Sequence, residues 1–285
     1  MKRLVIGAAL IVSASLLIAA PAHAGPDDFF ADFSDPPALY YTMYGGGVRL
    51  AHTQCGDDAC ASLESAGGTD HLRVAIEPSA TPGYYTNADV SQVDMEGSAL
   101  TDSGPYTATY GHPVTLSTRI KWSATYDFLG EGPAVGTSGV VLWNSAFDSP
   151  GSPPNAEYDQ IGFTWANEDA LLGLIAGFRG STFVDQAPIG AAQPASPVNI
   201  RSWMNLTMVW SANAQGAQTV AYYLENTLFG QHSLPVALEG LSLEIWTDNQ
   251  EPYPCPGDPQ TLCVSNPNPN VTQSLYVDQV SVTQT

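Results

Sequence analysis

Basic residues are scarce in this sequence. It contains 8 Lys and Arg against 28 Asp and Glu, which gives a formal net charge of −20 at pH 7. A surface this acidic repels phosphate backbones, so the composition argues against nucleic acid as a partner. Neutral or cationic ligands and divalent cations are compatible with it. In a second reading, the charge only keeps an exported protein soluble.

After its first residues, the sequence lacks an apolar run long enough to cross a membrane. Residues 1–3 (Met-Lys-Arg) are a positively charged start, residues 4–20 are apolar, and residues 22–24 (Ala-His-Ala) form a small-residue cleavage site. This order is typical of a secretory signal peptide. We therefore expect residues 1–24 to be a signal peptide and the mature protein to be secreted, without a membrane span. Because no composition shift or long linker divides residues 25–285, they are expected to form a single domain.

Cysteine is also scarce, with four residues in the chain. In an exported protein, four cysteines indicate two disulfides. Cys55 and Cys60 are close in sequence, as are Cys255 and Cys263, so local pairing is the simplest of the possible connectivities. The histidines show no zinc spacing, and no Gly-x-Ser-x-Gly is present. The sequence therefore predicts neither a zinc site nor a Ser-His-Asp hydrolase.

Capped amphipathic helices are missing as well. Instead, 26 Gly and 22 Pro separate short runs rich in Val, Thr, Tyr, Phe and Trp, which is typical of an all-β protein. We expect about eleven to fourteen strands in two antiparallel sheets packed face to face. The clearest expected strands are residues 71–76, 113–122, 139–144, 203–211, 218–224, 228–231, 241–250 and 274–282. Other expectations are a disulfide-closed loop at 55–68, a polar, Gly-rich passage at 81–110 and a buried strand or short helix at 171–178.

The stretch from Asn155 to Trp165 carries the strongest functional signal. In a strand, alternation would put Glu157, Asp159, Ile161, Phe163 and Trp165 on one face. Carboxylates beside an exposed aromatic ring are typical of a sugar-binding groove, because the ring packs on C–H groups while the acids accept hydroxyl protons. A glycosidase also takes its acid and nucleophile from two such carboxyl groups. For Glu157 and Asp159, three readings stay open: solvent-facing carboxylates, ligand binding without chemistry, and catalysis.

Other candidate substrate-binding residues are indoles and strand-end polar groups. The indoles of Trp143, Trp165 and Trp246 are candidate stacking platforms for sugar rings, although tryptophan is also an ordinary core residue. Asn144, Asp248 and Asn249 follow two of these indoles. They are candidate hydrogen-bond partners of sugar hydroxyls, or simply the residues with which a turn begins.

Three segments together resemble the concanavalin A-like jelly rolls, and among these glycoside hydrolase family 16. Residues 276–282 (Tyr-Val-Asp-Gln-Val-Ser-Val) resemble the closing strand of that family. Residues 203–230 resemble its tryptophan-containing strand and the turn that follows, and Glu157-Tyr-Asp159 stands where the family has Glu-x-Asp-x-Glu or Glu-x-Asp-x-x-Glu. The resemblance implies an all-β, antiparallel jelly-roll β-sandwich with a concave groove.

The same resemblance implies catalytic roles. Glu157 would be the nucleophile of a retaining mechanism and Asp159 the residue that tunes it. The third carboxylate of the family, the general acid/base, is missing, because its two candidate positions hold isoleucine and glycine. A retaining mechanism needs a second carboxyl group, which Glu168 or Glu244 would have to supply from elsewhere.

The resemblance also implies a structural Ca²⁺, with Asp278 of the closing strand as a ligand. Calcium takes six to eight oxygen ligands, and the acidic turn around Asp32 and Asp35 is a second source of them. The leading functional hypothesis is a monomeric secreted protein that recognises a polysaccharide or glycoconjugate on its concave face. One alternative is a retaining endo-glycosidase acting on β-glucan or galactan. Another is a structural or adhesive exported protein.

Overall fold

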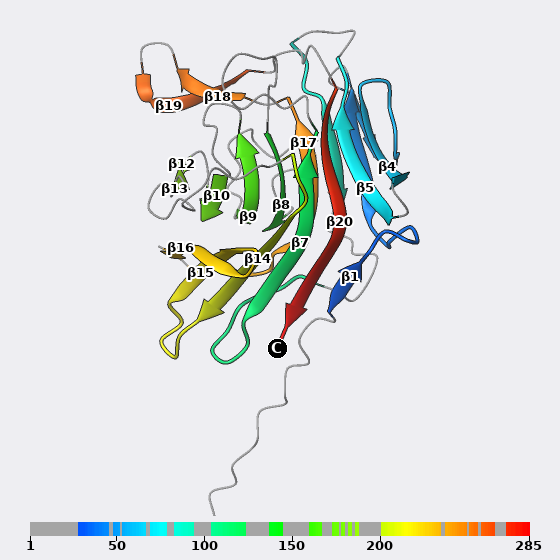
Figure 1. The fold of residues 1–285 in the computed structure, drawn as a ribbon. Coiled ribbons are helices and arrows are strands. Elements are labelled where there is room, and N and C mark those ends of the chain that lie inside the picture. Colours follow the sequence, from blue (N-terminus) through cyan, green and yellow to red (C-terminus); the bar gives the residue numbers. More distant parts are fainter. Residues whose placement is uncertain are drawn as a thin grey trace, which may run out of the picture.

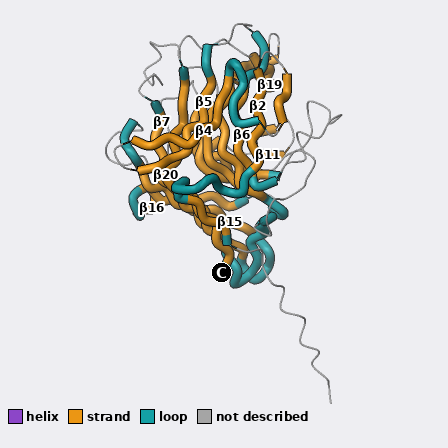
Figure 2. The backbone as a smooth tube through the Cα atoms, turned by 90° about the vertical axis from the view of Figure 1, so that its right-hand side faces the viewer, coloured by secondary structure: helices purple, strands orange, loops and turns teal. Residues whose placement is uncertain are grey.

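The computed structural model shows a chain built from β-strands and loops, with no helix among the described residues (Figures 1 and 2). The described residues are 28–45, 48–51, 53–66, 69–78, 83–93, 104–123, 137–144, 160–166, 173–176, 178–179, 182–183, 186–187, 201–234, 237–249, 251–255, 258–265 and 272–285. Within them, no helix has the length and hydropathy that a membrane crossing requires. The signal peptide predicted at residues 1–24 lies outside them and stays a prediction.

The strands form two large sheets in which every pairing is antiparallel. The first sheet has the order β16 (Thr227–Ser233), β15 (Gln218–Leu224), β14 (Met204–Ala212), β7 (Val114–Trp122), β20 (Gln273–Gln284), β5 (Thr69–Ile76) and β4 (Ala59–Ala66), with β1 (Phe29–Ala31) paired to β20. The second has the order β13 (Gln186–Ala187), β10 (Gly173–Ala176), β9 (Gln160–Ala166), β8 (Thr137–Trp143), β17 (Ser242–Asp248), β6 (Asn87–Ser91), β2 (Tyr40–Gly45) and β3 (Val48–Ala51). Two hairpins stand apart: β11 (Phe178–Arg179) with β12 (Thr182–Phe183), and β18 (Glu251–Cys255) with β19 (Asp258–Ser265). The prediction of an all-β protein with two antiparallel sheets is confirmed.

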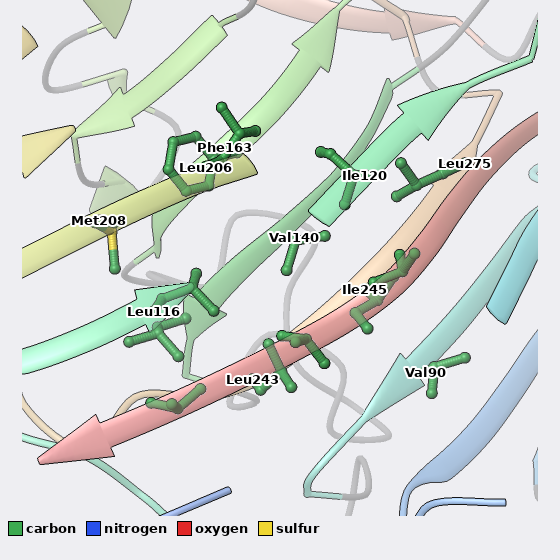
Figure 3. Packing of buried hydrophobic residues seen from close by; sticks show 14 of the residues in the cluster. Val90, Leu116, Ile120, Val140, Phe163, Leu206, Met208, Leu243, Ile245 and Leu275 are labelled. Atoms are coloured by element: carbon green, nitrogen blue, oxygen red, sulfur yellow. The ribbon is translucent and has the colours of Figure 1, made fainter. Parts of the chain in front are cut away.

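Alternation along the strands builds the core between the two sheets. In β7, Val114, Leu116, Ile120 and Trp122 are fully buried, while the residues between them are partly exposed or polar. Side chains from the second sheet complete the same cluster (Figure 3). The labelled members are Val90, Leu116, Ile120, Val140, Phe163, Leu206, Met208, Leu243, Ile245 and Leu275. Each such side chain contributes about 1.5–3 kcal/mol of burial free energy, so the pairing of the sheets rests mainly on this layer.

The outer face of the first sheet carries a basic and aromatic cluster. Lys121 Nζ lies 4.6 Å from the ring centroid of Trp203 and 4.9 Å from that of Tyr276. Arg119 lies over the same indole, at 5.2 Å, and forms an ion pair with Asp278. A cation over an aromatic face is attracted by the ring quadrupole, so these contacts hold β7, β20 and the residue before β14 together.

Candidate functional site

The polar side of the second sheet faces away from the core. In β17, Leu243 and Ile245 point into the core, so Ser242, Glu244, Trp246 and Asp248 point outward. The same alternation in the neighbouring strands gives an outer face made of Thr42, Asn87, Asp89, Ser91, Val141, Trp143, Gln160, Ser242, Glu244, Trp246 and Asp248. All of these side chains are less than a tenth exposed. These side chains are therefore largely shielded from solvent.

Strand register fixes which of these residues are neighbours. Trp246 of β17 lies opposite Asp89 of β6, and Asp248 lies opposite Asn87. Directly opposed residues on one face have Cβ atoms about 4.5–5.5 Å apart, so each pair can share a ligand. On the other side of β17, Ser242 lies opposite Trp143 of β8.

The two indoles of this face, Trp143 and Trp246, form a small apolar cluster of their own with Val141. The absence of a side chain at Gly139 makes this possible, because a Cβ there would lie 2.8 Å from the Trp246 ring. That Cβ would also lie 2.4 Å from the carbonyl oxygen of Phe163. Trp143 and Trp246, predicted as stacking platforms, are thus brought together, with exposures of 8% and 9%. Gly139 was predicted to lie in a strand but was not predicted as a residue of the site.

Three carboxylates lie on the outer face: Asp89, Glu244 and Asp248, with exposures of 3%, 6% and 3%. A buried carboxylate is costly unless hydrogen bonds or opposite charge compensate it. One such bond comes from the hydroxyl of Tyr85, which donates to Asp248 Oδ2 at 3.4 Å. Asp89 was missed in the sequence, although the alternation of Asn87-Ala-Asp89-Val-Ser91 is the signal of a strand with one polar face.

Asn249, also predicted to bind substrate, is 1% exposed and bonded to the chain just before β6. Its Oδ1 accepts a hydrogen bond from the Thr86 amide at 2.9 Å, and its Nδ2 donates to the Tyr84 carbonyl at 2.8 Å. The Asn249 amide in turn donates to the Thr86 carbonyl at 3.1 Å. These bonds hold the Tyr84–Thr86 segment beside Asp248.

On β9 the core face carries Ile161 and Phe163, and both are completely buried in the main cluster. The two side chains share one face, as predicted, and that face packs between the sheets. Gln160 is the β9 member of the outer face. Glu157 and Asp159 lie outside the described residues, so their predicted roles stay predictions.

The remaining predicted substrate-binding residues are only partly described. Trp165 lies opposite Ser138 in the register of β8 and β9, and its side chain is outside the described part. Asn144 follows β8 directly and is half-buried. No role for either residue is tested.

The residue predicted to bind calcium, Asp278, lies on the opposite side of the molecule from this outer face. It sits at an irregularity in the pairing of β20 with β7, on the first sheet, and its carboxylate pairs with Arg119. Asp32 Oδ1 accepts bonds from the Ser34 amide and hydroxyl at 3.1 and 2.7 Å, which lower the pKa of that carboxyl. In the described part of the chain, no three His, Cys, Asp or Glu side chains are grouped to hold a metal ion. Calcium stays a prediction.

The disulfide predictions differ in outcome. Cys55 and Cys60 are bonded to each other. Cys255 and Cys263 lie on the paired strands β18 and β19, where Cys263 faces Tyr253, but their side chains are outside the described part. The second disulfide therefore stays a prediction.

The sequence matches no family model and no curated protein sequence. Solved structures are similar to it in fold. The endo-1,3-β-glucanase from Streptomyces sioyaensis superposes with a TM-score of 0.52 at 13% identity, covering 93% of this chain and 99% of that one. The GlcNAcα1-4Gal-releasing endo-β-galactosidase of Clostridium perfringens gives 0.47 at 13% identity, covering 93% and 64%, and a seed lectin of Lotus tetragonolobus gives 0.44 at 10%, covering 91% and 98%. The predicted fold, an antiparallel jelly-roll β-sandwich, is confirmed.

Proposed function

We propose that this is a secreted protein that recognises a polysaccharide on the outer face of its second sheet. The observation that carries the proposal is the meeting of two indoles, Trp143 and Trp246, with three carboxylates on one face. An indole offers an apolar surface for the C–H groups of a pyranose ring, while carboxylates accept hydrogen bonds from its hydroxyls. The fold shared with an endo-1,3-β-glucanase is consistent with this ligand class.

Binding of the mature protein, residues 25–285, to a panel of soluble and insoluble polysaccharides tests the proposal. The panel contains β-1,3-glucan, mixed-linkage glucan, galactan and amino-sugar polymers. Trp143→Ala and Trp246→Ala are expected to weaken binding at least about tenfold, because each removes a stacking surface. Trp203→Ala is the matched control, since this indole lies on the first sheet beside Lys121. A loss in Trp203→Ala equal to that in the other two would place the ligand elsewhere.

A retaining endo-glycosidase is the second candidate. It is favoured by the position of Asp89, which lies diagonally across from Glu244 because Asp89 faces Trp246 and Ser91 faces Glu244. Diagonal neighbours are about 7–8 Å apart at Cα, from which two carboxyl groups can reach the 5–5.5 Å separation of a retaining pair. Release of reducing ends that is lost in Glu244→Gln would support catalysis by this pair. Release lost only in Glu157→Gln would support the catalytic role that the family resemblance implies.

Further parts of the proposal are a monomeric state, a Cys255–Cys263 disulfide and a structural Ca²⁺ held with the help of Asp278. A bound ion stabilises the folded state by mass action, so chelation should lower the Tm if Ca²⁺ is present. An unchanged Tm after chelation would count against the ion. Asp278→Asn should remove the dependence on chelator.

A further inference from the structure

A row of side chains crosses the outer face of the first sheet, away from the two indoles of the second sheet. Strand register defines the row, because each member lies directly opposite the next one on the neighbouring strand. From β16 to β1, the members are Leu228, Tyr223, Thr207, Ser117, Ser281 and Phe30. We call them the hydroxyl row. Because neighbouring strands lie about 4.8 Å apart, the row is about 24 Å long.

The hydroxyl row points away from the core and is open to solvent. Each member is next to a core side chain on its own strand, as Thr207 is to Leu206 and Met208. Phe30 is 64% and Leu228 is 50% exposed, and the four side chains between them are half-buried. A ligand can therefore reach this row directly, whereas the side chains on the outer face of the second sheet are largely shielded.

The chemistry of the row changes from its ends to its middle. A hydroxyl group both donates and accepts hydrogen bonds, so the four side chains in the middle can pair with sugar hydroxyls in either role. The hydroxyl oxygens of Ser117 and Thr207 lie 3.3 Å apart and bond each other, which orders the centre of the row. Leu228, Phe30 and the ring of Tyr223 offer apolar surface to the C–H groups of a sugar ring.

The hydroxyl row carries no charge, although the chain has 28 Asp and Glu. The next row along the same strands is uncharged as well, and its members are Ala221, Val209, Thr115 and Thr283. On the other flank the charged groups are bonded, because Arg119 pairs with Asp278 and Glu225 accepts from the Asn205 amide at 2.8 Å. A ligand on the hydroxyl row therefore desolvates no charged member of the row, and an ionic polymer finds no counter-charge in it.

We propose that the hydroxyl row is a second binding surface, which holds an extended, uncharged polysaccharide chain. Single exposed apolar side chains are normal on a protein surface. In the described part of the chain, however, five large hydrophobic side chains are exposed, and two of them, Phe30 and Leu228, stand at the two ends of this row. The ligand class rests on the proposed function, whereas the surface is separate from the face that carries Trp143 and Trp246.

Co-sedimentation of the mature protein with an insoluble β-1,3-glucan tests the proposal. Ser117→Glu puts a carboxylate in the middle of the row and should weaken binding about tenfold, because that charge must be desolvated under the ligand. Ser62→Glu is the matched control, since this half-buried serine lies on the same face but on β4, opposite Arg73. It should bind like the wild type.

A second pair of variants tests the end of the row without adding charge. Phe30→Ala should weaken binding several-fold, because it removes the most exposed apolar surface of the row. Leu63→Ala, which trims a side chain that is 38% exposed on β4, should leave binding unchanged. An equal loss in Phe30→Ala and Leu63→Ala, or in Ser117→Glu and Ser62→Glu, would overturn the proposal.

Comparison with Trp246→Ala separates this proposal from the proposed function. Wild-type binding by Ser117→Glu and Phe30→Ala, with a loss in Trp246→Ala, would overturn the second surface and leave the first site in place. A loss in Ser117→Glu and Phe30→Ala, with wild-type binding by Trp246→Ala, would support the hydroxyl row and contradict the site on the second sheet. If the wild type binds no polysaccharide, both proposals fail.

Discussion

The Trp246 indole can take its position because Gly139 has no side chain. A Cβ would stand 2.4 Å from the Phe163 carbonyl oxygen and 2.8 Å from the indole, so β8 and β9 could not keep their spacing. We expect Gly139→Ala to destabilise the protein by about 1–3 kcal/mol, the usual cost of overpacking. Urea unfolding followed by tryptophan fluorescence would measure it.

The control for this substitution is Gly216→Ala. No atom lies within 4 Å of the Cβ added there, and only the positive φ of +82° opposes it. The cost should be about 1–2 kcal/mol from backbone conformation, with no change in the environment of the indoles. Gly139→Ala should also displace the indole of Trp246, and unchanged tryptophan fluorescence of the folded variant would contradict this displacement.

The protonation of the Tyr222 hydroxyl affects the stability of the folded protein at high pH. It is completely buried on β15, its ring meets Phe163 edge-on at 5.6 Å, and burial raises its pKa above the ordinary value of 10.0. The folded state therefore keeps a proton that the unfolded state releases. Burial of the neutral phenol stabilises the folded state in full below pH 10.0. This stabilisation is lost as the pH rises above that value, by up to about 1.4 kcal/mol per pH unit.

The measurement for Tyr222 is the free energy of unfolding between about pH 9 and pH 11, for the wild type and Tyr222→Phe. In the variant, the unfolding free energy should fall less steeply with pH, because unfolding releases one proton fewer. Tyr41 also has a raised pKa from burial, so some slope remains in the variant. Identical slopes for the two proteins would show that Tyr222 does not govern this pH dependence.

Among the elements, β15 is joined to distant loops through one buried side chain. Gln218 accepts from Trp210 Nε1 at 3.0 Å and from the Leu238 amide at 2.8 Å, and it donates to the carbonyls of Ala108 and Leu238 at 3.2 and 3.0 Å. Gln218→Leu would leave all of these groups buried and unsatisfied. We expect a loss of about 3–5 kcal/mol in unfolding free energy.

Gln215→Leu makes the same chemical change at an exposed position of the neighbouring turn. It should change the unfolding free energy by no more than about 0.5 kcal/mol. Chemical denaturation would measure the unfolding free energies of the Gln218→Leu and Gln215→Leu variants. A Gln218→Leu protein as stable as the control would mean that the four bonds contribute nothing net.

Regular alternation made several elements predictable. The strand predicted at residues 113–122 is β7, which begins one residue later, and the strands predicted at 218–224 and 228–231 are the paired β15 and β16. Residues 171–178, which fitted a buried strand or a short helix, contain β10. β7 and β15 have one apolar face, which is the signal that alternation detects, whereas the segment with β10 was recognised by its continuous apolar run.

The elements that were missed have polar or loop-like sequences. β6 lies in a passage predicted to be polar and Gly-rich, because three of its five residues are polar and point outward. β4 occupies most of the segment 55–68, where a disulfide-closed loop was expected, and it pairs with β5, of which residues 71–76 were predicted. The site itself was half predicted: Trp143, Trp246 and Asp248 stand on the outer face, whereas Asp89 required the register of β6 against β17. The pairing of two strands about 150 residues apart cannot be predicted from the local sequence of either strand.

For the whole molecule, the dominant property is the net charge of −20. Like charges on one compact body repel, and salt screens them over a distance of about 10 Å at 0.1 M. We expect the Tm to rise as NaCl is raised from about 0.05 to 0.5 M, by about 2–4 °C for each kcal/mol recovered. KCl should act equally at the same ionic strength. A Tm that falls or stays level would show that repulsion does not limit stability.

The missing side chain at Gly139 also constrains how this protein can change over evolutionary time. Positions 139 and 246 lie opposite each other in the register of β8 and β17, and the ring of one occupies the space that a side chain at the other would need. Among homologous proteins, an alanine or larger residue at the first position should therefore be accompanied by a smaller residue at the second. The two positions are expected to covary, and lineages that lose the glycine should also lose the tryptophan from the outer face.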